Sequence, residues 1–355
     1  MNLFFAALLL IAASGNLHAA DSPSPLPLKP ACRGLMLRDY RGSIPEPLRA
    51  FINDVVVLVR WDELETSDQT FDGPGWARID RALDRGLRVR LRILAGIHAP
   101  DFVKTAGGDP VLVINSFQPE HRGTVPRFWT REVLDHYEQL MREVARRYEH
   151  HDDLCEVVAS GAMTIFAEPL YRAQRDADSH RRLAAAGLDA DTDRAAHDRV
   201  LRIHHEVFLR TRTTLAINAW DVLDADGQHT VSIPATRDFV LRSRELMGSK
   251  LVLQNNGLRS RSLPAATSAA DNIYAFLTEI DGPKGYQTAT LVHLGASHDN
   301  PAPLIEAISH AVRSGAQFIE LPAGSAQFTP SALAQLHALD AALSHNARDT
   351  VQSPP

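Results

Sequence analysis

Two carboxylates in this sequence stand at the ends of apolar segments of the kind that form buried strands. Glu168 follows the apolar stretch 154–165, and Glu320 lies between two apolar residues. Partial burial at a strand end raises the pKa of a carboxyl group, so that it holds a proton near neutral pH. Cleavage of a glycosidic bond commonly uses one such acid and a second carboxylate. Glu168 and Glu320 are therefore candidates for two such carboxylates. The alternative for each is a structural ion pair, which for Glu320 would be with Arg38.

Side chains suited to binding sugar rings and hydroxyls follow other predicted strands. Aromatic rings stack against sugar faces, while imidazole and amide groups both donate and accept hydrogen bonds. Each candidate also has a structural alternative, because tryptophans fill cores, a lone histidine is commonly a packing residue and Asn-Gly pairs favour turns. The residues that we expect to line a sugar site are Trp61, His98, Trp220, Asn256 and His293.

Eight β-rich segments alternate with helical patterns along the chain, and they must position these side chains. Continuous apolar runs such as 54–61 suit parallel strands that are buried on both faces. Eight such alternations predict a single-domain (β/α)₈ barrel, in which chemistry lies at the carboxyl ends of the strands. A doubly wound open sheet has the same alternation of strands and helices and remains an alternative. The predicted strands are 34–38, 54–61, 87–95, 154–165, 213–218, 250–255, 285–294 and 317–321.

The two ends of the chain differ in character from the predicted barrel. Residues 3–13 form an apolar run that is too short to cross a bilayer as a helix, and small residues follow it. We interpret 1–20 as a signal peptide, with an N-terminal membrane anchor as the alternative, and 21–32 as a Pro-rich linker. The barrel then spans 33–343, and 344–355 is a flexible tail. This organisation predicts a periplasmic or secreted protein without stable membrane insertion after cleavage.

The overall composition is that of a globular protein, with 45% hydrophobic and 23% charged residues. The formal net charge of −6 argues against a nucleic-acid partner. The chain contains no zinc-protease, phosphate-loop or dinucleotide motif, so we expect neither a metal nor an organic cofactor. The two cysteines, Cys32 and Cys155, are compatible with one disulfide or with two separate buried thiols. The oligomeric state is left open.

The segment that begins at Trp61 resembles the clan A glycoside hydrolases, a superfamily of barrels that includes β-galactosidases and cellulases. In that clan a tryptophan-carboxylate strand end leads into a helix and then into a strand that closes in a Pro-containing loop. The resemblance covers about residues 33–325 in the order of elements. Its motifs here are Trp61-Asp62-Glu63-Leu64-Glu65, Phe71-Asp72, Trp76, Ile79-Asp80, Gly86-Leu87 and His98-Ala99-Pro100.

The resemblance implies a role for Glu168 and also shows two departures from the clan. The fourth strand of the clan ends in Asn-Glu, where Glu is the acid/base, and Glu168-Pro169 occupies that place here. Ala167 replaces the asparagine, and 285–294 lacks the nucleophilic Glu that ends the clan's seventh strand. The second carboxylate is therefore either displaced to Glu320 or absent. We thus expect an exported glycoside hydrolase acting on a poly- or oligosaccharide. The alternatives are a non-catalytic glycan-binding barrel and, third, another barrel enzyme such as a lyase or isomerase.

Overall fold

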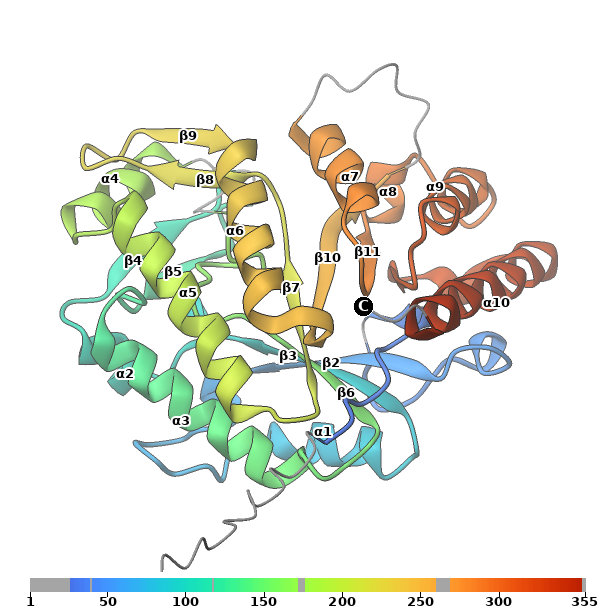
Figure 1. Cartoon of the computed structure of the whole chain (residues 1–355), viewed down its shortest axis with the longest axis horizontal. Coiled ribbons are helices and arrows are strands. Elements are labelled where there is room, and N and C mark those ends of the chain that lie inside the picture. The colour runs from blue at the N-terminus through green and yellow to red at the C-terminus, as the bar shows by residue number, and fades with distance from the viewer. Residues whose placement is uncertain (1–25, 39, 117, 172–175, 260–268, 353–355) are drawn as a thin grey trace, which may run out of the picture.

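Eight parallel strands close into a barrel that is surrounded by helices (Figure 1). The computed structural model describes residues 26–38, 40–116, 118–171, 176–259 and 269–352. The first and last strands pair with each other, which confirms the (β/α)₈ barrel and excludes the open doubly wound sheet. In order around the barrel the strands are β1 (Gly34–Leu37), β2 (Asp54–Arg60), β3 (Arg88–Leu94), β6 (Leu154–Val158), β7 (Arg212–Ala216), β10 (Leu251–Leu258), β11 (Lys284–Thr288) and β12 (Phe318–Leu321).

The helices pack their apolar faces against the outside of the barrel. In α3 the apolar residues from Val133 to Tyr148 recur at helical spacing and are buried on one face of the helix. Among the described residues, no helix has the length and apolar character needed to cross a membrane. The helices are α1 (Trp76–Leu83), α2 (Asp101–Ala106), α3 (Arg131–Tyr148), α4 (Ala177–Ala185), α5 (Ala190–Val207), α6 (Ile233–Met247), α7 (Ala269–Glu279), α8 (Leu291–Leu294), α9 (Ala302–Arg313) and α10 (Pro330–Gln352).

Two antiparallel hairpins extend the loops that follow barrel strands. The hairpin β4 (Val111–Ile114)–β5 (Arg122–Val125) lies between β3 and α3. The hairpin β8 (Trp220–Leu223)–β9 (His229–Ser232) follows β7 and lies beside α6 (Figure 1). Both hairpins therefore belong to the connections that lead from strand ends into helices, where a barrel builds its site.

Two predicted strands end earlier than their apolar sequences indicate. β6 ends at Val158, and the apolar residues 159–165 form a buried loop that packs over the end of β3. Ile97 N donates to Thr164 O (3.0 Å), and Gly96 is needed there because a Cβ would lie 1.9 Å from that oxygen. Glu168 consequently belongs to the loop after β6 rather than to the strand. The prediction of a strand over 154–165 is wrong beyond Val158. A segment that is buried as a loop has the same apolar composition as one that is buried in a sheet, so composition does not distinguish them.

The seventh barrel strand shows the same kind of difference. β11 ends at Thr288, and Leu291–Leu294 forms the short helix α8. Thr290 caps that helix by accepting a hydrogen bond at Oγ1 from His293 N (3.3 Å). His293 is therefore an exposed helix residue and not the end of a strand.

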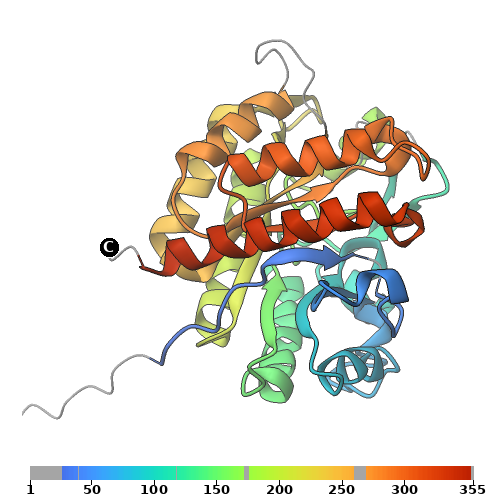
Figure 2. The same cartoon turned by 90° about the vertical axis from the view of Figure 1, so that its right-hand side faces the viewer.

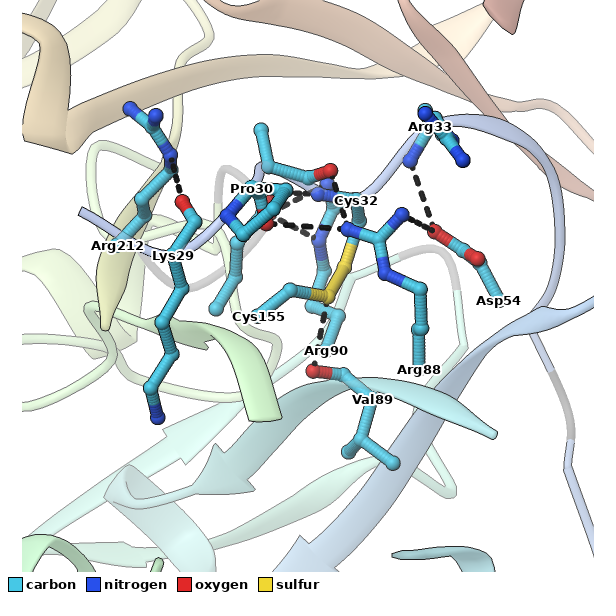
Figure 3. Close-up of a disulfide and its surroundings, with 12 residues drawn as sticks. Lys29, Pro30, Cys32, Arg33, Asp54, Arg88, Val89, Arg90, Cys155 and Arg212 are labelled. Atoms are coloured by element: carbon cyan, nitrogen blue, oxygen red, sulfur yellow. Dashed lines mark hydrogen bonds and ion pairs between the residues drawn. A yellow bond between two sulfur atoms is a disulfide. The ribbon is translucent and has the colours of Figure 1, made fainter. Parts of the chain in front are cut away.

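The segment before β1 is tied to the amino-terminal end of the barrel (Figure 3). Cys32 and Cys155 form a disulfide with their Cα atoms 5.8 Å apart, which decides between the two alternatives left open by the sequence. Arg88 Nη2 donates to Ala31 O (2.5 Å), and Lys29 Nζ donates to His151 O (2.9 Å). The described part of the expected linker is thus held against the barrel, while the expected signal peptide lies outside the described residues.

The carboxyl-terminal helix packs along β1 and beside α9, as Figure 2 shows. Where the sequence predicts a flexible tail from residue 344, α10 continues to Gln352. The side chain of Asn346 explains the difference, since Nδ2 donates to Val312 O (2.9 Å) and to Ala316 O (2.8 Å). These bonds tie the last turns of α10 to the end of α9 and to the residue that leads into β12.

Candidate active site

Charged side chains occupy the interior of the barrel in two connected layers. In the lower layer, Arg90 of β3 donates from Nε to Glu156 Oε2 of β6 (2.8 Å) and from Nη1 to Gln254 Oε1 of β10 (2.5 Å). Thr214 Oγ1 donates to the same glutamate oxygen (2.6 Å), and Cys32 N donates to the other one (2.7 Å). The side chains of Arg90 and Glu156 have no exposed surface. Such charges are stable inside a protein only when they are paired and hydrogen-bonded, as they are here.

The upper layer begins two residues further along β3, at Arg92. Its Nη2 donates to Glu320 Oε1 of β12 (2.7 Å), and its Nη1 donates to Gln287 Oε1 of β11 (3.2 Å). Arg90 Nη1 donates to the same Glu320 oxygen (3.0 Å) and so joins the two layers. Strand register places Asn256 of β10, Gln287 and Glu320 beside one another. The side chains of Asn256 and Gln287 are partly exposed, so this level borders the mouth of the barrel.

Glu168 meets this upper layer from the loop after β6. Asn256 Nδ2 donates to Glu168 Oε1 (3.1 Å), and the Glu168 side chain is partly exposed, so a ligand can reach it. Burial raises the pKa of Glu168 above its ordinary value, and the negative charge of Glu320 acts in the same direction. The hydrogen bond from Asn256 and the positive charges of Arg92 and Arg38 oppose that shift without cancelling it. Glu168 therefore keeps its proton to a higher pH than a free glutamic acid, as a general acid must.

Glu320 is the enclosed member of this upper layer. Burial alone would raise the pKa of Glu320, but the charges of Arg92 and Arg90 hold it below its ordinary value, so the carboxylate is ionised. Its side chain has no exposed surface, and among the described residues Oε2 has no hydrogen-bond partner. The structural ion pair kept as an alternative is therefore present, with Arg90 and Arg92 in place of Arg38. The role of second carboxylate stays a prediction for Glu320.

Both tryptophans of the predicted sugar site are packed into the protein. Trp61 is 1% exposed, its Nε1 donates to Glu65 Oε2 (2.7 Å), and its ring meets Tyr137 edge-on. Trp220 is 4% exposed, and its Nε1 donates to Asp193 Oδ2 (3.0 Å). Trp220 also borders an outer cavity of about 340 Å³ between α5, α6 and the β8–β9 hairpin. Neither indole offers an open face at the barrel mouth, so we include neither in the site proposed below.

Neither of the two predicted histidines hydrogen-bonds to Glu168 among the described residues. The charges that act on His98 belong to Arg60, Asp62, Lys104 and Glu63, around the ends of β2 and β3, while burial lowers its pKa. His293 is exposed on α8, where its Nδ1 lies 3.1 Å from the Thr290 hydroxyl. Of the seven residues predicted from the sequence, the structure thus brings Glu168, Asn256 and Glu320 together.

Several residues of the site were not among the sequence candidates. Arg90, Arg92 and Glu156 form the core of the network, and Gln254 and Gln287 complete it. A signal for the arginines was present, because Arg88-Val-Arg-Leu-Arg92 alternates charged and apolar residues within a strand of a barrel. Period-two alternation places Arg90 and Arg92 on one face, and a buried face with two arginines needs carboxylates opposite to it.

One group among the described residues has the ligand types and spacing of a metal site. Atoms of Cys32, Cys155 and Glu156 lie within 4.8 Å of one another. The two sulfurs are bonded to each other, and Glu156 already accepts hydrogen bonds from Arg90 and Thr214. This group therefore serves the packing of the barrel, and we assign no metal to it.

Comparison with known proteins shows which enzymes share this fold. The sequence matches no protein-family model and no curated protein. The catalytic domain of a β-amylase from Paenibacillus polymyxa is similar over 88% of this chain and 98% of its own, with 10% identity and a TM-score of 0.52. A β-galactosidase from the psychrophilic Marinomonas ef1 is similar over 90% of this chain and 62% of its own, with 14% identity and a TM-score of 0.50. The chain shares the (β/α)₈ barrel fold of these two enzymes.

That likeness confirms the resemblance found in the sequence at the level of the fold. With 10% and 14% identity it assigns no side chain a role. Fold by itself does not determine function, because one barrel hosts many reactions. The argument for a reaction must therefore come from the geometry around Glu168.

Proposed function

We propose that the protein is an exported glycoside hydrolase that cleaves a poly- or oligosaccharide, with Glu168 as the acid. One observation carries this proposal: a partly exposed carboxyl group with a raised pKa is held by Asn256 at the mouth of a glycosidase-type barrel. Glu168 gives its proton to the glycosidic oxygen as the bond from that oxygen to the anomeric carbon breaks. A water molecule adds at the anomeric carbon, and the proton that it releases restores Glu168.

Export is supported by two independent features of the chain. The apolar run at residues 3–13 has the length of a signal peptide core. The disulfide between Cys32 and Cys155 belongs to the kind of bond that persists in oxidising compartments such as the periplasm or the extracellular space. Both features favour a protein that meets its saccharide outside the cytoplasm.

A second function, glycan binding without hydrolysis, is favoured by the state of the other polar groups. Glu320 is enclosed and bonded to two arginines, and the partly exposed side chain that β11 contributes at this level is Gln287, an amide. A glycosidase commonly needs a second carboxylate that touches the substrate or its water. If Glu320 stays closed to substrate, the barrel binds saccharides without cleaving them.

The experiment that separates the two functions measures turnover and binding on one panel of saccharides. The panel contains neutral and acidic polysaccharides together with α- and β-aryl glycosides, and release of reducing ends or of the aryl group reports cleavage. Catalytic turnover of any member supports the hydrolase. Saturable binding, followed by calorimetry, without turnover on the same ligands would replace it with the glycan-binding function.

The pH dependence of turnover tests whether Glu168 is the acid within this network. Glu320→Gln removes a negative charge that raises the pKa of Glu168, so that pKa falls. Because Glu168 must be protonated to act, the alkaline limb of the kcat/KM profile moves to lower pH. Arg92→Gln removes a positive charge that lowers the same pKa, so the limb moves to higher pH. The assignment of Glu168 as the acid would be contradicted if the alkaline limb moved in the same direction for both variants, or did not move in either.

A further inference from the structure

Arg38 is a cation at the barrel mouth that has no carboxylate partner within the part of the chain that the structure describes. It follows β1, is half-buried, and its Nη1 donates to Thr288 O at the end of β11 (2.9 Å). Since β12 lies between β1 and β11, Arg38 reaches across the strand that carries Glu320. Within the described residues this is the only hydrogen bond that Arg38 makes. A guanidinium has five N–H donors in a planar fork that matches carboxylate and sulfate oxygens, so most of its binding capacity is unused.

The charges around Glu168 do not balance when Glu168 holds its proton. The charged neighbours that act on it are Arg92, Arg38 and Glu320, which are two cations and one anion. The layer below does not change this count, because Arg90 is matched by Glu156 at 2.6 Å. Arg92 also has a buried Nε without a partner among the described residues. Among the described residues that act most strongly on Glu168, one positive charge is therefore in excess.

We propose that Arg38 binds an anionic group, a carboxylate or a sulfate, on the sugar at the scissile bond, so that the substrate is an acidic saccharide. This inference rests on the proposed function and specifies its substrate class. A neutral sugar would leave the guanidinium half-buried without a counter-charge, whereas an anionic one supplies it with charge-assisted hydrogen bonds.

Binding of an anion beside Arg38 also suits the acid chemistry. The positive charge of Arg38 favours loss of the proton from Glu168. An anion that pairs with Arg38 cancels this influence, so Glu168 keeps its proton more firmly once the substrate is bound. An acidic substrate thus raises the pKa of Glu168 when it binds, and a neutral substrate of the same shape does not.

The test measures binding separately from cleavage, by calorimetry in a Glu168→Gln background in which turnover of these oligosaccharides is slowed. The probes are matched oligosaccharides: galacturonate and galactose trimers, and cellotriose in its native, C6-carboxylated and 6-sulfated forms. We expect at least one acidic member to bind about ten- to a hundredfold tighter than its neutral partner, as charge-assisted hydrogen bonds provide. Arg38→Met removes this preference and leaves neutral affinity unchanged, and Arg38→Lys keeps part of it. Preference for the sulfated over the carboxylated form identifies sulfate as the anion.

A matched control is available in Arg127. It is also half-buried, donates from Nε to a backbone carbonyl, Asp109 O (3.0 Å), and has no carboxylate partner among the described residues. Arg127→Met is expected to leave the acidic preference intact. Equal affinity for acidic and neutral probes, or equal loss from Arg38→Met and Arg127→Met, overturns the inference. Acid-selective binding that depends on Arg38 without turnover by the native chain supports the inference while refuting the hydrolase, so the two failures are distinguishable.

Discussion

Glu168→Gln is expected to lower kcat by two to four orders of magnitude on substrates with a poor leaving group, the range that a positioned general acid supplies. In the native chain, Asn256 Nδ2 donates to Glu168 Oε1 (3.1 Å). The substitution keeps the size of the side chain, and the amide oxygen of the glutamine can accept the same hydrogen bond. What it removes is the proton that the leaving oxygen needs. KM should change little, because the amide fills the same space at the barrel mouth.

The leaving group provides an internal check on that interpretation. A dinitrophenyl group departs without protonation, so the variant should be far closer to the wild type on such a glycoside than on an oligosaccharide. Glu65→Gln is the control, since Glu65 also has a raised pKa and accepts a hydrogen bond, from Trp61 (2.7 Å), but it is buried and lies outside the network. Equal losses in both glutamine variants, or equal losses on good and poor leaving groups, would move the acid to another residue.

The order of the elements could be predicted from the sequence, because burial on both sides of a parallel strand leaves a continuous apolar run. The run at 54–61 corresponds to β2 (Asp54–Arg60), and 87–95 corresponds to β3 (Arg88–Leu94). The same logic failed at residues 159–165, where an equally apolar segment is buried as a loop across Gly96. Local composition reports burial, and it does not report whether the partner is a strand or a loop.

The composition of the site was less accessible to sequence reasoning. Asn256 and Glu168 meet although 88 residues separate them, and Arg90 and Glu320 meet across 230 residues. No spacing rule links such residues before the barrel closes. Trp61 shows that a residue type does not by itself assign a role, since an aromatic residue at a strand end suggested stacking on a sugar and its ring packs against Tyr137. Charge balance inside the barrel is the physical rule that relates the arginines of β3 to Glu156 and Glu320.

The second large effect concerns that charge balance and the stability of the fold. Arg90→Met should lower the free energy of unfolding by about 3–5 kcal/mol, because it leaves two enclosed carboxylates without a shared partner. Arg90 is bonded to both Glu156 and Glu320, has no exposed surface and lies 3.8 Å from the centre of the Phe318 ring. Methionine fills a similar volume but provides no donor. Urea denaturation followed by circular dichroism measures the change.

An exposed ion pair of the same length shows why burial determines the size of this effect. Arg142 on α3 lies 2.6 Å from Glu138, as close as Arg90 lies to Glu156, but its side chain is 60% exposed. Arg142→Met is therefore expected to change the free energy of unfolding by no more than about 1 kcal/mol. Similar losses from the two variants would mean that the interior charges are solvated in the folded state. In that case Glu320 would be open to water, and its exclusion from direct contact with a substrate would no longer hold. The stability measurement thus bears on whether the barrel has a second carboxylate able to take part in hydrolysis.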